Sequence, residues 1–185
     1  MRKRFAQLVF WLFGWRLKVE NVDGYAPSVM IAAPHTTNWD FIFSIGAFWQ
    51  MGIPLRYFIK DAYTRSLFGF FFKWSGAIGV DRSKRGSGLT DYAVELLQKN
   101  RKLVILVPAE GTRKRVDKWR TGFYRIALEA NVPISLGYLD YAKKEAGVLL
   151  AFQPTGEFEK DMQFIQEQYS RIAPKHPENY NPQIY

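Results

Sequence analysis

The chain has 185 residues, enough for one domain with a sizeable hydrophobic core. Its 26 Lys and Arg outnumber its 17 Asp and Glu, which gives a net charge of +9, and 17% of the residues are aromatic. The hydrophobic share of 48% argues against a disordered chain or a polytopic membrane protein, and the lack of cysteine excludes a disulfide scaffold and a thiol nucleophile. A basic, aromatic-rich domain suits an anionic partner: nucleic acid, anionic lipid or a phosphorylated substrate.

Residues 1–20 combine aromatic side chains with basic residues, and no acidic residue occurs before Glu20. The uncharged run Phe5–Trp15 has 11 residues, whereas about 20 are needed to span a bilayer. Basic residues flank the run on both sides, at Arg2, Lys3, Arg4, Arg16 and Lys18. We therefore predict an amphipathic helix that lies on an anionic membrane surface. The alternative is a helix that packs its apolar residues on the core of the domain.

Strand and helix patterns alternate along residues 21–172. Short apolar runs predict strands at 28–33, 55–59, 77–80, 103–107, 133–139 and 148–152. Helical patterns lie between and after them, at 40–51, 65–74, 89–98, 121–130 and 157–172. This alternation predicts a single α/β domain with a mixed, largely parallel sheet flanked by helices. Residues 173–185 contain three prolines and are expected to form an extended or mobile tail, which includes His176.

Charged or titratable residues follow four of the predicted strands directly. His35 follows the first, Lys60 the second, Asp81–Arg82 the third and Glu110–Arg113 the fourth. Ligands of open parallel sheets bind beyond the carboxyl ends of the strands. We therefore expect these four groups to converge on one site.

His35 and Asp40 are a candidate catalytic pair. A tight turn between a strand and a helix can bring the carboxylate to one imidazole nitrogen. A carboxylate on Nδ1–H fixes the tautomer and leaves Nε2 free as a general base. Without a cysteine or an obvious serine nucleophile, such a pair would activate a substrate hydroxyl or water. The alternative is that Asp40 caps the helix and His35 is an ordinary turn residue.

Arg82 and Arg113 are candidate phosphate ligands, because each follows a strand and a guanidinium offers a bidentate fork to phosphate. Lys60 is a candidate for assisting phosphate or coenzyme A binding. The other basic residues between 113 and 125 are interpreted as a solvated face. The aromatic run Phe68–Trp74 is interpreted as core packing, with contact to a lipid or acyl chain as the alternative.

Four motifs occur in order between residues 31 and 138. They are His35-x4-Asp40, Gly76-x-Ile-x-x-Asp-Arg82, Glu110-Gly-Thr-Arg113 and Val132-Pro133-Ile134. Together they resemble the four motifs of the glycerolipid acyltransferase family, whose best-known members are the 1-acylglycerol-3-phosphate acyltransferases.

The resemblance implies that residues 21–172 transfer a fatty acyl chain to the hydroxyl of a lysophospholipid such as 1-acylglycerol-3-phosphate, giving phosphatidic acid. The donor would be acyl-CoA or acyl-carrier protein, with no bound cofactor and no metal. By the same resemblance, His35 is the general base and Asp40 orients it, while Arg82 and Arg113 hold the acceptor phosphate. The remaining motif residues would shape the phosphate pocket (Glu110, Gly111 and Thr112) or line the acyl side (Val132, Pro133 and Ile134).

The sequence leaves other functions as alternatives. The family commonly has Asn before the histidine and Ser two residues after it, where this chain has Pro34 and Thr37. Another lysolipid or an amino-acid lipid is therefore an alternative acceptor, and a non-catalytic membrane-surface protein is a further alternative. No nucleic-acid partner is expected, because no nucleic-acid-binding motif is present. We expect a peripheral or monotopic protein at the cytoplasmic face of the cell membrane.

Overall fold

The computed structural model describes residues 1–19, 25–81 and 88–185. Within them, the strands are β1 (Arg16–Lys18), β2 (Ser28–Ala32), β3 (Leu55–Lys60), β4 (Ala77–Val80), β5 (Val104–Pro108), β6 (Ile134–Asp140) and β7 (Glu145–Phe152). The α-helices are α1 (Arg2–Phe13), α2 (Trp39–Met51), α3 (Asp61–Thr64), α4 (Gly69–Ser75), α5 (Leu89–Lys99), α6 (Gly122–Ala130) and α7 (Phe158–Tyr169).

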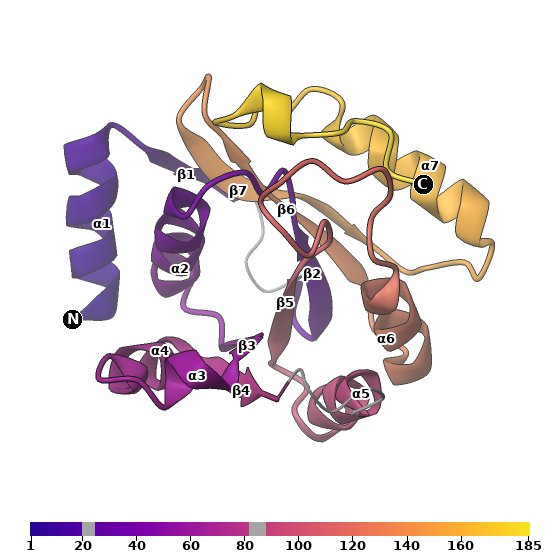
Figure 1. The fold of residues 1–185 in the computed structure, drawn as a ribbon, viewed down its shortest axis with the longest axis horizontal. Coiled ribbons are helices and arrows are strands. Elements are labelled where there is room, and N and C mark those ends of the chain that lie inside the picture. The colour runs from indigo at the N-terminus through magenta and orange to yellow at the C-terminus, as the bar shows by residue number, and fades with distance from the viewer. Residues whose placement is uncertain (20–24, 82–87) are drawn as a thin grey trace.

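The strands form one sheet in the order β1-β7-β6-β2-β5-β3-β4 (Figure 1). The strands from β6 to β4 are mutually parallel, β7 pairs antiparallel with β6, and β1 runs parallel to β7 at the edge. This confirms the predicted α/β domain with a mixed, largely parallel sheet flanked by helices.

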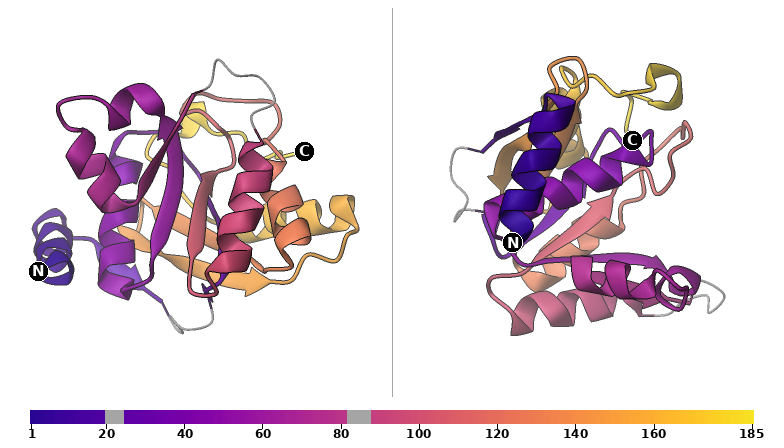
Figure 2. Two further views of the ribbon diagram at one scale, coloured as in Figure 1. Left: turned by 90° about the horizontal axis from the view of Figure 1, so that it is seen from below. Right: turned by 90° about the vertical axis from the view of Figure 1, so that its left-hand side faces the viewer.

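Helices cover both faces of the sheet. On one face α5, α6 and α7 pack on the large core cluster, and on the other face α2 packs on β2, β3 and β5. Figure 2 shows α1 on the outer side of α2, with α3 and α4 nearby, while α5 to α7 lie together at the opposite end of the molecule. Val29, Ile31 and Ile105 on the central strands are fully buried, because these strands are paired on both sides and covered on both faces.

The N-terminal helix is shorter than the predicted segment 1–20. It ends at Phe13, because Gly14 adopts the left-handed conformation that closes a helix, with φ 70°. Arg16–Lys18 then pair with β7 as an edge strand. Gly46 lets α1 approach α2 closely, since a Cβ there would lie 2.8 Å from the Phe10 ring.

The predicted helix 65–74 is also wrong in its limits. The structure has two short helices, α3 and α4, joined by a turn. At Gly69 a Cβ would lie only 2.2 Å from the Thr64 carbonyl oxygen, so the glycine permits this tight connection. The core-packing interpretation of Phe68–Trp74 is wrong as well, because Phe68, Phe70 and Trp74 are exposed.

The C-terminal tail, expected to be extended or mobile, packs against the domain. A 3₁₀ turn forms at Pro177–Asn179, and Tyr180 and Ile184 are buried in the large core cluster. The backbone N–H of Trp119 donates to the Ile184 carbonyl at 2.9 Å, and the backbone N–H of Ile184 donates to Oε1 of Gln166 at 3.0 Å. Apolar burial therefore outweighs the local preference of a proline-rich segment for extended, solvated backbone.

In the part of the chain that the structure describes, every helix is too short or too polar to span a membrane. The longest of the helices described above is α2, with 13 residues, or roughly 20 Å.

Candidate active site

The carboxyl ends of the parallel strands bring together residues that are far apart in the chain. His35 lies in the loop after β2, Glu110 in the loop after β5, and Tyr141 directly after β6. These three strands are neighbours, with β2 between β5 and β6, so their loops meet at one edge of the sheet (Figure 1). Asp40 reaches the same edge from the first turn of α2.

The Asp40 carboxylate is buried and accepts four hydrogen bonds. Oδ2 lies 3.1 Å from Nδ1 of His35 and accepts the backbone N–H groups of Thr36 at 2.8 Å and Thr37 at 2.9 Å. Oδ1 accepts the hydroxyl of Tyr141 at 2.6 Å. Asp40 thus binds the loop that precedes α2 and makes no capping bond to the helix, contrary to the capping alternative.

This arrangement selects one tautomer of His35. Because Nδ1 faces a carboxylate, Nδ1 carries the proton and Nε2 carries the lone pair. The imidazole is partly buried, with 21% of its side-chain surface exposed. No hydrogen bond to Nε2 is found among residues 1–19, 25–81 and 88–185. The structure therefore presents Nε2 as a proton acceptor at the carboxyl edge of the sheet.

Glu110 holds the backbone of His35. Its two carboxylate oxygens accept the His35 N–H at 3.1 and 2.9 Å. Burial raises the pKa of Glu110 to about 7, and the hydrogen bond from His35 acts in the opposite direction. The carboxylate fixes the turn that carries the imidazole, a contact that the sequence motif did not indicate.

Arg113 lies beside the same loop. Its Nη1 donates to Oδ1 of Asn38, the residue that precedes α2, and its side chain is exposed. The loop folds back at Gly111, whose φ is 68° and whose Cβ would lie 2.6 Å from the Arg120 side chain. Thr112 is exposed next to Arg113. The structure thus joins the Glu110–Arg113 loop to the His35–Asp40 loop.

The other two predicted basic ligands are Arg82 and Lys60. Arg82 lies outside the described residues, so the structure does not place it. Lys60 is exposed at the carboxyl end of β3, two strands from β2, or about 10 Å across the sheet. Among the described residues no hydrogen bond or ion pair links Lys60 to His35 or Arg113.

The structure places Val132, Pro133 and Ile134, predicted to line the acyl side, at the start of β6 and away from the carboxyl edge of the sheet. Val132 and Ile134 are buried in the core, and the Pro133 carbonyl accepts the N–H of Val29. Ile134 pairs with Val29, three residues before the end of β2, which is roughly 10 Å from the carboxyl edge. The motif marks the start of β6, and its apolar side chains are buried where helix α6 joins the sheet.

Tyr141 and Lys175 are residues near the site that the sequence analysis missed. Tyr141 follows β6 directly, so the rule that found His35 and Glu110 would also have found it. Lys175 lies with Nζ 5.4 Å from the Trp39 ring centroid and 6.0 Å from that of Tyr141. Its position depends on the folded tail, which no local pattern indicates.

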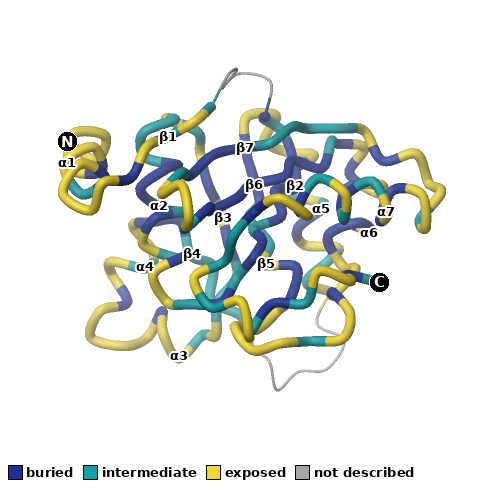
Figure 3. The backbone as a smooth tube through the Cα atoms, turned by 90° about the horizontal axis from the view of Figure 1, so that it is seen from above, coloured by how far each residue is buried: buried dark blue, intermediate teal, exposed yellow. Residues whose placement is uncertain are grey.

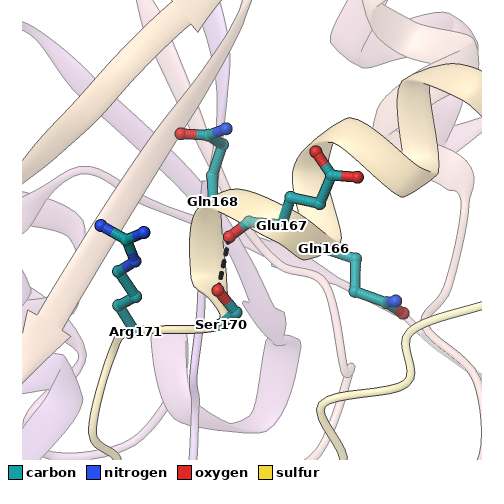
Figure 4. Close-up of a pocket in the computed structure, with 5 residues that line it drawn as sticks. All are labelled: Gln166, Glu167, Gln168, Ser170 and Arg171. Carbon is teal, nitrogen blue, oxygen red and sulfur yellow. Dashed lines mark hydrogen bonds between the residues drawn. The ribbon is translucent and has the colours of Figure 1, made fainter.

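The pocket in Figure 4 lies elsewhere, at the end of α7, with a volume of about 570 Å³. None of the predicted site residues lines it; its side chains are Gln166, Glu167, Gln168, Ser170 and Arg171. No group of three or more His, Asp and Glu residues suited to a metal ion occurs within the described part of the chain.

Comparisons with known proteins bear on this cluster. The family model described as "Acyltransferase" matches residues 16–135, which include His35, Asp40 and Glu110–Arg113. The fold is similar to the crystal structure of PlsC, a 1-acyl-sn-glycerophosphate acyltransferase from Thermotoga maritima, with a TM-score of 0.60 and 14% identity over 90% of this chain and 74% of that chain. No curated protein gives a significant match. Because the family match spans more than half of the sequence, the chain belongs to the acyltransferase family, as its motifs predicted.

Proposed function

We propose that this protein transfers a fatty acyl chain from acyl-CoA or acyl-carrier protein to the free hydroxyl of 1-acylglycerol-3-phosphate, giving phosphatidic acid. The observation that carries the proposal is the contact between His35 Nδ1 and Asp40 Oδ2 at 3.1 Å, inside the range matched by the acyltransferase family. The likeness to a structure named as a 1-acyl-sn-glycerophosphate acyltransferase supports this choice of acceptor.

The reaction uses His35 as the general base. Nε2 takes the proton of the acceptor hydroxyl as its oxygen attacks the thioester carbonyl. The carbon–sulfur bond then breaks while the carbon–oxygen ester bond remains, and the proton on Nε2 passes to the departing thiolate. Asp40 stabilises the imidazolium formed in between. The lack of cysteine excludes a thiol-linked intermediate and favours direct transfer to the acceptor hydroxyl.

The acceptor phosphate binds to Arg113 in this proposal. Arg113 is exposed, and its contact with Asn38 places it next to the loop that carries His35. Arg82 is a second phosphate ligand on the strength of its motif, and Lys60 is an auxiliary contact for phosphate or coenzyme A. Gly111 and Thr112 form the backbone of the pocket beside Arg113.

The reaction takes place at the cytoplasmic face of the membrane, with α1 lying on the bilayer. The helix supports this with a divided surface: Ala6 and Phe10 are buried against the domain, whereas Leu8, Trp11 and Leu12 are exposed. Exposed indole and leucine side chains suit the boundary between headgroups and acyl chains. The basic residues at the start of α1 match anionic lipid.

The test is acyl transfer to lysophosphatidic acid with purified protein and an acyl-CoA, followed by mass spectrometry of the product. His35→Ala should lower turnover by about 10²–10⁴-fold, since a general base is lost. His176→Ala is the matched control: its imidazole contacts Glu178 and not the cluster, and only its backbone N–H, which the substitution keeps, donates to Thr36 beside His35. Wild-type turnover by His35→Ala would refute the mechanism, and a product formed only from another lysolipid in a panel would refute the acceptor.

A further inference from the structure

The segment 67–74 carries bulky apolar side chains that face solvent. Leu67 is 87% exposed and Phe70 is 72% exposed, and Phe68 and Trp74 are exposed as well. Figure 3 shows long exposed stretches in α1 and around α3 and α4, in contrast to the buried central strands. An apolar cluster of this size on a protein surface marks a place of interaction.

A groove of about 350 Å³ joins this segment to α1. It lies between the start of α1, the turn from α2 to β3 and the end of α4, and its lining includes Arg2, Trp49, Arg56 and Trp74. The Arg2 guanidinium lies 4.2 Å from the centroid of the Trp74 ring, and the rings of Trp49 and Trp74 are 4.8 Å apart. We call this the α1–α4 groove. It combines two cations with two indoles.

The charge around the α1–α4 groove has one sign. Neither α1 nor residues 65–76 contain Asp or Glu, whereas both contain basic residues. In the part of the chain that the structure describes, no ion pair neutralises Arg2 or Arg56. The groove is therefore complementary to an anion.

We propose that the α1–α4 groove binds the headgroup phosphate of an anionic bilayer phospholipid, while the side chains of segment 67–74 enter the acyl layer. Arg2 and Arg56 pair with the phosphate, since a guanidinium matches phosphate oxygens in a bidentate manner. Trp49 and Trp74 lie at the level of the headgroups, where indoles are enriched. This rests on the proposed function, whose substrates are membrane lipids.

The groove is separate from the candidate active site. α2 begins next to His35 and Asp40 and ends at the groove, so the two sites lie about the length of this helix apart, roughly 20 Å. A phospholipid in the groove is therefore a docking lipid and not the acceptor. With α1 and segment 67–74 both on the bilayer, α2 is held at a constant angle to the membrane.

A phospholipid fits the α1–α4 groove better than free phosphate or a phosphorylated metabolite. A soluble anion needs only the two arginines, and it leaves the apolar side chains of segment 67–74 in water. A bilayer lipid satisfies both features at once, because its phosphate and its acyl chains are adjacent.

The first experiment measures binding of the full chain to vesicles by co-sedimentation. Vesicles of phosphatidylcholine are compared with vesicles that also contain phosphatidylglycerol. Arg2→Gln combined with Arg56→Gln should weaken binding to the anionic vesicles roughly 30-fold, since each basic residue contributes about fivefold. The matched control, Lys160→Gln combined with Arg171→Gln, removes one positive charge from α7 and one from the turn after it, and should bind like the wild type.

The second experiment tests the apolar half of the site. Phe70→Ser should weaken vesicle binding roughly tenfold, because one aromatic side chain no longer enters the acyl layer. Leu128→Ser is the matched control, an exposed apolar residue on α6. Each variant should remain folded, because the substituted side chains are exposed. Circular dichroism melting checks this.

Several outcomes would overturn this inference. One is equal binding of the wild type to both kinds of vesicle, and another is unchanged binding of the double arginine variant. Release of the protein from vesicles by inorganic phosphate at matched ionic strength would assign the groove to a soluble anion. A dimer that Phe70→Ser dissociates in sedimentation velocity would assign the surface to self-association. Turnover of the wild type on acceptor dispersed in neutral detergent tests the proposed function separately, so the two failures can be told apart.

Discussion

The hydroxyl of Tyr141 donates a 2.6 Å hydrogen bond to Oδ1 of Asp40, whose other oxygen contacts Nδ1 of His35. Two strands and a helix thus converge on one carboxylate: β2 supplies the histidine, β6 the tyrosine and α2 the aspartate. Burial and the bond to Asp40 raise the pKa of the Tyr141 hydroxyl far above its ordinary value, so it remains a donor at all working pH values.

Tyr141→Phe tests whether this bond positions Asp40 for catalysis. The variant loses one donor to a charged group, so kcat should fall about tenfold while the KM for the acceptor stays unchanged. Tyr63→Phe, a tyrosine on α3 outside the cluster, is the control. A positioning role would be contradicted if Tyr63→Phe lowered kcat and the melting temperature as much as Tyr141→Phe does. It would also be contradicted if Tyr141→Phe changed only the KM for the acceptor.

Glu110→Gln tests the pH dependence that burial imposes. The folded protein keeps a proton on Glu110 up to a pH of about 7, whereas the unfolded chain releases it near 4.5. Between these values the folded state binds more protons, so stability falls as the pH rises. The wild type should lose about 3 kcal/mol of unfolding free energy relative to Glu110→Gln across this window.

Denaturant titration of both proteins at a series of pH values measures this difference. Parallel pH curves for the wild type and Glu110→Gln would show that Glu110 does not titrate in this range. The comparison at one pH is less informative, because the Gln side chain also changes the hydrogen bond to His35.

Arg113→Ala tests the phosphate contact. Loss of a charge-assisted bond to phosphate should raise the KM for lysophosphatidic acid about tenfold or more, with a smaller change in kcat. The KM for monoacylglycerol, which has no phosphate, should not respond. Arg101→Ala removes an exposed arginine from the turn before β5 and serves as the control. An unchanged KM in Arg113→Ala would place the phosphate elsewhere.

Ile134→Ala tests whether the Val132–Ile134 motif serves the core or the acyl side. A fully buried isoleucine truncated to alanine should cost about 2–5 kcal/mol of unfolding free energy. Because the residue lies in the core and away from the carboxyl edge, the preference among acyl-CoA chain lengths should stay as in the wild type. A changed chain-length preference without a stability loss would return this motif to the acyl side.

Much of the fold followed from local patterns. The apolar runs before Pro34 and Pro108 predicted β2 and β5, and the polar residues after them predicted the edge where the site lies. These inferences succeed because a strand buried on both faces must be apolar throughout and its ends must be polar. The same reasoning failed for the edge strand β1, whose three residues gain their structure only by pairing with β7.

The sequence by itself determined the α/β class and the four motifs, because these depend on local patterns along the chain. It also indicated the pairing of a histidine with a carboxylate five residues later, because that pairing depends on spacing within one turn. Only the tertiary structure decided that Glu110 holds the His35 backbone, that Tyr141 holds Asp40 and that Val132–Ile134 belong to the core. It also turned the aromatic run of α4 outward and the proline-rich tail inward. Strand order and burial arise from contacts between distant segments, and composition near one residue carries no information about which distant segment will cover it.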